Sequence, residues 1–233
     1  RPLFTIDQKG IFEKEIDRTV ADKQVDFAVH SLKDVPSELP EGLVIASVPK
    51  RETSNDVLIT KDGLSLKSIP SGGLIGTSSL RRAVQISHQR SDLIVKPVRG
   101  NIETRINKVM DGKFDGIILA HAGISRLGLD IKFSILSTED FPPSPGQGAL
   151  AIVARSNDLE TVSMLEKIED TKSRKEIEAE RALSDYVDSG CRFPVGALAK
   201  IDTETMKLTV AAYSVDGKKS MVIEKSGDMN DPK

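Results

Sequence analysis

The stretch Gly73-Leu74-Ile75-Gly76-Thr77-Ser78-Ser79-Leu80-Arg81-Arg82 decides the fold class. Its first four residues form a short apolar run, which predicts a buried strand, and the three hydroxyl residues that follow are preferred at the start of a helix. A strand that turns directly into a helix is the repeating unit of α/β proteins. Because backbone N–H groups and the helix dipole favour an anion at such a helix start, the paired arginines favour a carboxylate or phosphate site there. An ordinary Ser/Thr cap with exposed arginines fits the pattern equally well.

Segments on both sides of this stretch repeat the alternation of strand, turn and helix. Further strands are expected at residues 25–30, 93–95, 116–120 and 149–153, and helices from Gly10, from about 102 through Asp111, and from Thr171 through Val187. This order predicts an α/β fold with a largely parallel sheet. The breaker cluster at 142–148 is a candidate hinge.

The two ends of the chain differ from this pattern. Residues 208–215 and 220–224 flank Asp216-Gly217 and predict a β-hairpin with a two-residue turn, so the last third reads as a small α+β unit. The start leads straight into a helical stretch without an opening strand. We therefore expect an N-terminal strand to be missing from the first α/β unit, and a closing helix to be missing after the hairpin.

Composition excludes several classes of function. The 233 residues carry 33 Lys and Arg against 35 Asp and Glu, a net charge of -2, which argues against a nucleic-acid partner. No apolar run is long enough to cross a bilayer. One cysteine and three dispersed histidines form no metal-ligand pattern, and no P-loop or dinucleotide motif is present.

Polar side chains follow several of the predicted strands, where open α/β sheets bind ligands. One such segment is His30-Ser31-Leu32-Lys33-Asp34-Val35-Pro36. Others carry Arg99, Arg105 and Arg126, which together with the arginine pair predict a pocket for a ligand with several carboxylates or phosphates. The alternative is that Asp34 caps a turn and each arginine is a solvated surface group.

The only cysteine lies in the stretch Ser189-Gly190-Cys191-Arg192-Phe193-Pro194, between a predicted helix and a predicted strand. A lone cysteine is more often an inert buried residue than a reactive one. The loop setting beside Gly190 favours an exposed thiol. No histidine lies within ten residues, so a local Cys/His nucleophile has no support.

These segments, in this order, resemble the porphobilinogen deaminase (hydroxymethylbilane synthase) family. The resemblance runs from about Leu3 to Val215 and rests on the two strings that begin at His30 and Gly76. It also rests on shorter matches: Lys9-Gly10-Ile11-Phe12, Arg99-Gly100-Asn101, Arg126-Leu127-Gly128, Pro145-Gly146-Gln147-Gly148-Ala149, Glu180-Arg181-Ala182 and Gly190-Cys191.

The resemblance implies two periplasmic-binding-protein-like α/β lobes and a small C-terminal α+β domain. The implied boundaries are 1–50 with 148–168 for the first domain, 54–143 for the second and 171–233 for the third. The family joins four porphobilinogen molecules head to tail into hydroxymethylbilane, with release of ammonia, in heme biosynthesis. A dipyrromethane primer held by a thioether, here on Cys191, is the implied cofactor. A monomer located in the cytoplasm, or in a plastid-like organelle, is the implied setting.

Each site residue is likewise carried over from the resemblance. Asp34 is the implied catalytic carboxylate, which stabilises cationic pyrrole species. The implied cofactor and substrate contacts are Lys9, Phe12, Ser31, Lys33, Thr77, Ser78, Ser79, Arg81, Arg82, Arg99, Gly100, Asn101, Arg105 and Gln147. Each pyrrole ring bears an acetate and a propionate, so a growing chain is a polyanion that suits an arginine-rich cleft.

Two alternatives remain open at this point. A solute-binding protein for a polycarboxylate would need the arginines but neither Cys191 nor Asp34. An inactive homologue would lack the N-terminal segment that touches the cofactor in the family.

Overall fold

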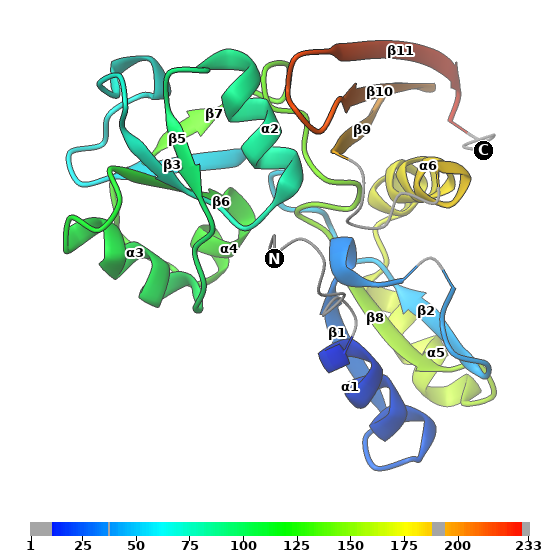
Figure 1. The fold of residues 1–233 in the computed structure, drawn as a ribbon. Helices are drawn as coiled ribbons and strands as arrows, with labels where there is room; N and C mark the ends of the chain where they lie inside the picture. Colours follow the sequence, from blue (N-terminus) through cyan, green and yellow to red (C-terminus); the bar gives the residue numbers. More distant parts are fainter. Residues whose placement is uncertain (1–10, 37, 188–193, 230–233) are drawn as a thin grey trace.

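The fold consists of three groups of elements, each with its own sheet (Figure 1). A computed structural model describes residues 11–36, 38–187 and 194–229. Two of the groups are α/β lobes and the third is a small C-terminal unit, so the expected fold class is confirmed. Within the described residues, no helix has the length and apolar character needed to cross a membrane.

The first lobe combines segments from before and after the second lobe. Its elements are α1 (Ile11–Ala21), β1 (Phe27–Ser31), the 3-10 turn η2 (Leu32–Asp34), β2 (Leu43–Ser47), β8 (Leu150–Arg155), α5 (Leu159–Leu165) and the 3-10 turn η4 (Glu166–Ile168). β8 lies between β1 and β2 and pairs antiparallel with both. The expected parallel arrangement is therefore wrong for this sheet, because β8 returns from the second lobe and runs against its neighbours.

The second lobe is a five-stranded sheet with helices on its faces. Its elements are β3 (Asp56–Thr60), the 3-10 turn η3 (Leu66–Ser68), β4 (Leu74–Gly76), α2 (Leu80–Gln89), β5 (Ile94–Lys96), α3 (Ile102–Met110), β6 (Gly116–Ala120), α4 (His121–Arg126) and β7 (Ser134–Leu136). The strand order is β5-β4-β6-β3-β7, with β5, β4 and β6 parallel. β3 is antiparallel to both of its neighbours, so this sheet is mixed.

Local sequence explains the central elements of this lobe. Every residue of β3 is buried, as expected of a strand covered on both faces. Separate apolar clusters lie around Leu58 and around Ile59, whose side chains point to opposite faces of the strand. α2 begins where the Ser79 hydroxyl accepts a hydrogen bond from the Arg82 backbone N–H, and α3 begins where Asn101 does the same for Thr104.

The C-terminal unit is one helix against a three-stranded antiparallel sheet. Its elements are α6 (Thr171–Val187), β9 (Val195–Asp202), β10 (Thr205–Tyr213) and β11 (Ser220–Asp228), in the strand order β11-β10-β9. The hairpin is present, but the predicted two-residue turn is wrong. Tyr213 pairs with Ser220, so the connection has six residues, closed by hydrogen bonds between Ser214 and Lys219.

Two segments, residues 48–55 and 142–149, connect the lobes and run close together. Gly148 has a φ of 89°, and a Cβ added there would lie 2.5 Å from the Glu52 carbonyl oxygen. Gly146 has a φ of 75°, and its added Cβ would lie 2.5 Å from a methyl carbon of Leu32. Both positions therefore require glycine. The domain boundaries and a hinge motion here stay predictions.

Candidate active site

The first part of the candidate site is the end of β1 and the turn η2 that follows it. Ser31 ends the strand, and Lys33 and Asp34 lie partly buried in η2. Burial, helped by the positive charge of Arg82, lowers the pKa of Lys33 to about 8. Arg181 of α6 donates a hydrogen bond of 2.8 Å to the Pro36 carbonyl, which ties the chain just after Asp34 to the third unit.

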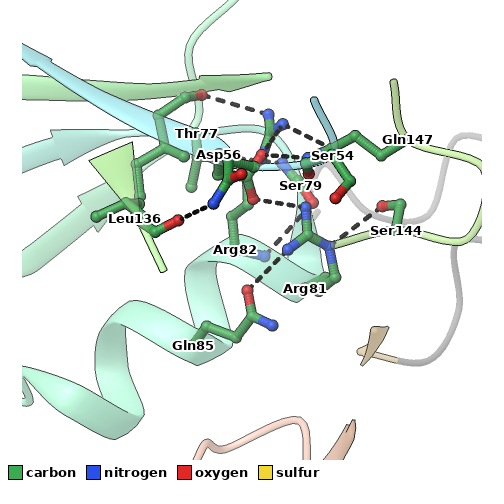
Figure 2. Close-up of polar contacts among 12 residues, drawn as sticks. Ser54, Asp56, Thr77, Ser79, Arg81, Arg82, Gln85, Leu136, Ser144 and Gln147 are labelled. Carbon is green, nitrogen blue, oxygen red and sulfur yellow. Dashed lines mark hydrogen bonds and ion pairs between the residues drawn. The ribbon is translucent and has the colours of Figure 1, made fainter. Parts of the chain in front are cut away.

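The second part is a buried ionic cluster around Asp56, at the start of β3 (Figure 2). Its carboxylate is fully buried and accepts hydrogen bonds from Arg81 at 2.8 Å and from Arg82 at 2.6 and 3.1 Å. The two arginines hold the pKa of Asp56 well below its usual range, against the opposing effect of burial. Because β3 is antiparallel to β6, its first residue lies opposite Ala120, the last residue of β6, at the edge where β4 also ends.

The guanidinium groups of Arg81 and Arg82 make different hydrogen bonds to the rest of the protein. Arg81, 4% exposed, also donates to Ser144, to the Gln85 side chain and to the Pro142 carbonyl. Arg82, 7% exposed, donates to the Ile118 carbonyl and to Gln147 at 3.3 Å. Of the two readings of this stretch, the one with exposed arginines is therefore wrong, because both head groups point inward to the acid that begins β3.

The three hydroxyl residues before α2 lie together but have different partners. Thr77 is buried and accepts from the Ser79 backbone N–H at 3.2 Å. The exposed Ser78 hydroxyl donates to the Val98 carbonyl at 2.7 Å and accepts from the Val98 N–H at 3.1 Å. Ser79 caps the helix. The Ser78 hydroxyl thus joins the loop after β4 to the loop after β5.

The third part of the candidate site is a shallow pocket of about 480 Å³ at the start of α3, lined by Gly100, Asn101, Ile102, Glu103, Arg105 and Leu127. Arg105 is partly buried and donates to the Gly100 carbonyl at 2.6 Å. Burial, then the charge of Arg82, lowers its pKa. Arg99 is exposed, and its carbonyl accepts from Lys108 at 2.8 Å.

Gln147 joins the connecting segments to the ionic cluster. Its side chain is 1% exposed and donates to Asp56 at 2.8 Å and to the Ser54 carbonyl at 2.7 Å. Arg126, at the end of α4, donates to the Gly148 carbonyl at 2.7 Å in the same segment. Both residues therefore link the second lobe to the crossing between lobes.

A second buried ion pair, between Arg51 and Glu180, was not predicted from the sequence. Glu180 of α6 is fully buried and accepts from Arg51 at 2.7 and 3.1 Å. It also accepts from the backbone N–H of Gly146 at 2.6 Å and of Ala199 at 2.8 Å. Burial raises the pKa of Glu180, and Arg51 and the two N–H groups oppose that rise. The pair joins both connecting segments to the C-terminal unit.

Some predicted site residues lie outside the described residues. These are Lys9, Cys191 and the side chain of Phe12. Among the described residues, no group of three or more His, Cys, Asp or Glu side chains could hold a metal ion.

Residues 1–163 match the family model "Porphobilinogen deaminase, dipyromethane cofactor binding domain", and residues 174–233 match "Porphobilinogen deaminase, C-terminal domain". The chain belongs to the porphobilinogen deaminase family. As a member it is an enzyme of tetrapyrrole biosynthesis with a dipyrromethane cofactor, as the resemblance implied. The alternative of a solute-binding protein is thereby set aside.

Curated relatives agree with this assignment. The chain is 68% identical over 233 residues to a probable porphobilinogen deaminase of Nitrosopumilus maritimus, covering all of this chain and 75% of the relative. It is 46% identical over 218 residues to the porphobilinogen deaminase of Brevibacillus brevis, covering 93% and 71% of the two chains.

Similarity to solved structures is weaker. The second substrate binding domain of a putative amino acid ABC transporter from Streptococcus pneumoniae is 12% identical, with a TM-score of 0.42 and coverage of 75% and 73%. That similarity is too low to support any inference.

The described donors fit a dipyrromethane group. The group has two pyrrole rings, each with an acetate and a propionate, so it carries four carboxylates. In the protein, Lys33 and Arg105 are cations whose pKa values are both lowered in part by the charge of Arg82. Cations that crowd one another in the protein alone are stabilised when an anion binds between them.

Proposed function

We propose that this chain joins four porphobilinogen molecules into hydroxymethylbilane with release of ammonia, using a dipyrromethane primer on Cys191. The observation that carries the proposal is the match of residues 1–163 and 174–233 to the two domains of the family. In the structure, Lys33, Arg82 and Arg105 form a cationic cluster in which the charge of Arg82 helps to lower the pKa values of the other two. Such a cluster suits a substrate with several carboxylates, and porphobilinogen has two. The proposal includes a monomer in the cytoplasm, where one cysteine suits a reducing environment.

The proposal uses three domains, with boundaries at 1–50 and 148–168, at 54–143 and at 171–233. The first two would enclose the substrate between η2 and the α2 and α3 ends, and the third would carry the primer. When bound, the dipyrromethane supplies the pyrrole carbon to which substrate units are joined.

Substrate and cofactor carboxylates would be bound by residues of both lobes. Lys33 and Arg105 are partly buried cations and Arg99 is exposed, so we propose that these three side chains bind the carboxylates. Gly100 and Asn101 line the same pocket. Arg82 would contribute mainly its charge, since its head group already binds Asp56. The remaining proposed contacts are Lys9, Phe12, Ser31, Thr77, Ser78, Ser79, Arg81 and Gln147.

Asp34 is the proposed catalytic carboxylate. Positive charge develops on the substrate pyrrole as its aminomethyl nitrogen leaves as ammonia. An ionised carboxylate fixed beside that ring stabilises the charge more in the transition state than in the ground state, which accelerates the step. The hydrogen bond from Arg181 to the Pro36 carbonyl supports a fixed position for Asp34.

The experiment that tests the proposal compares Arg105→Leu with the control Arg18→Leu. Arg18 is an arginine of α1 whose side chain is 82% exposed. Consumption of porphobilinogen and release of ammonia are measured at a series of substrate concentrations. A lost charge-assisted contact of about 1.5–3 kcal/mol raises KM by about 10- to 150-fold in Arg105→Leu and leaves Arg18→Leu unchanged. Equal KM values in the two variants would refute the proposed binding role.

A further inference from the structure

One buried carboxylate faces two arginines in the second lobe, and nothing in the proposed reaction uses it. Asp56 has no exposed surface, and its two oxygens divide the arginines between them: Oδ2 binds Arg81, and Oδ1 binds Arg82. Oδ1 also accepts from the Gln147 side chain at 2.8 Å. A single carboxylate therefore fixes both guanidinium groups and one residue of the connection between lobes.

The cluster has an excess of positive charge that acts on Lys33 of the first lobe. One negative charge on Asp56 faces two positive charges, so one positive charge is left over inside the lobe. Lys33, in the other lobe, responds to this cluster: Arg82 and Arg81 disfavour its protonated form, while Asp34 and Asp56 favour it. Among the described residues, these four groups have the largest charge effects on Lys33. Removing Asp56 would therefore change how readily Lys33 keeps its proton.

We propose that Asp56 is a positioning residue of the active site, which holds the guanidinium group of Arg82 in place and so fixes the positive charge that acts on Lys33 and on substrate carboxylates. The proposal rests on the proposed function, because it assumes that Lys33 and Arg82 face the bound polyanion. A purely structural Asp56 would contribute stability alone. A positioning Asp56 also changes the titration of Lys33, a residue of the other lobe.

The test is Asp56→Asn, which keeps the shape of the side chain and removes its charge. Asp92→Asn is the matched control, because Asp92 lies in the same lobe in an ion pair of 2.7 Å with Arg90 but does not act on Lys33. Acetic anhydride labels only neutral amines, so labelling of Lys33 between about pH 6 and 11, read by peptide mass mapping, reports its titration without substrate. We expect the midpoint of Lys33 to fall by at least about half a pH unit in Asp56→Asn and to stay unchanged in the control.

Steady-state kinetics supply the second readout. In the cofactor-loaded fraction of Asp56→Asn, KM for porphobilinogen should rise by about tenfold or more, with a smaller change in kcat, because binding is lost rather than chemistry. A Lys33 midpoint or a KM equal to that of the unmodified enzyme would overturn the proposal. Failure of the proposed function gives a different result. If Lys33 does not bind substrate, Lys33→Gln leaves KM for porphobilinogen unchanged, whatever midpoint the labelling gives for Lys33 in Asp56→Asn.

Asp56→Glu keeps the test decisive if Asp56→Asn does not fold. Its charge is retained, so the Lys33 midpoint should stay within about 0.2 pH units of the unmodified enzyme. Its extra methylene displaces the guanidinium of Arg82, so KM should still rise by several-fold. An unchanged KM in Asp56→Glu would show that the position of Arg82 is irrelevant to substrate binding and would overturn the proposal.

Discussion

The substitution Glu180→Gln tests how the three units are held together. The carboxylate of Glu180 has no exposed surface and accepts four hydrogen bonds, two from Arg51 and one each from the backbone of Gly146 and Ala199. Glutamine keeps the shape but is neutral, and its NH₂ group must face one of these donors. Arg51, whose side chain is 8% exposed, then loses its partner at 2.7 Å and keeps only the longer contact of 3.9 Å with Glu176.

The expected loss follows from these contacts. Breaking a buried ion pair by removing one partner costs about 3–5 kcal/mol. For a chain of this size each kcal/mol corresponds to about 2–4 °C in Tm, so the melting temperature should fall by roughly 6–20 °C. Thermal melts at pH 7, followed by circular dichroism, measure the change. Glu178→Gln is the control, because Glu178 lies on the same helix with a partly exposed side chain, and its Tm should stay within about 2 °C.

A fall of less than about 2 °C in Glu180→Gln would refute this reasoning. It would mean that burial, which raises the pKa of Glu180, keeps the carboxyl group neutral at pH 7 and that Arg51 is held by other contacts.

Three further predictions concern the active site and the crossing between lobes. Asp34→Asn should fold normally yet lose most turnover, while Asp34→Glu should retain some. If the two variants have equal turnover in steady-state assays, Asp34 only caps its turn. The pKa of Lys33 in the folded protein is about 8, below the ordinary 10.5. Protonated Lys33 therefore lowers the free energy of unfolding below pH 8, and this loss of stability disappears as the pH rises from 8 to 10.5. Substrate affinity should change the opposite way, with KM rising above pH 8, and a KM that is flat from pH 7 to 9.5 would contradict a role for Lys33. Gly148→Ala should destabilise the protein by more than about 2 kcal/mol in denaturant melts, because the new Cβ meets the carbonyl oxygens of Glu52 and Thr53 at 2.5 and 2.6 Å; a neutral effect would show that the crossing segments move apart freely.

Much of the fold could be predicted because its signals are local. The strand at Gly116–Ala120 and the helix at Thr171–Val187 have the expected bounds, since an apolar run and a helical spacing of apolar residues need no distant partner. The order of the strands could not be predicted in this way. β3 enters the second sheet antiparallel, and β8 returns to the first lobe across a long stretch of chain. Such pairings depend on residues far apart in sequence.

The same distinction explains the candidate site. The hydroxyl residues and arginines after the strands were found because they follow strand ends along the chain. Asp56 was missed because it begins its strand rather than following one, and only the antiparallel direction of β3 brings it to the edge where Arg82 lies. Glu180 was within a recognised stretch, but its partner Arg51 is 129 residues away, and no local pattern connects the two.

The most direct test of the account is the mass of the freshly purified, intact protein and of its Cys191 peptide. We predict a mass above that of the sequence by one dipyrromethane unit, located on Cys191 by peptide mapping and absent from Cys191→Ser. Protein that consumes porphobilinogen while carrying an unmodified Cys191 would contradict the account.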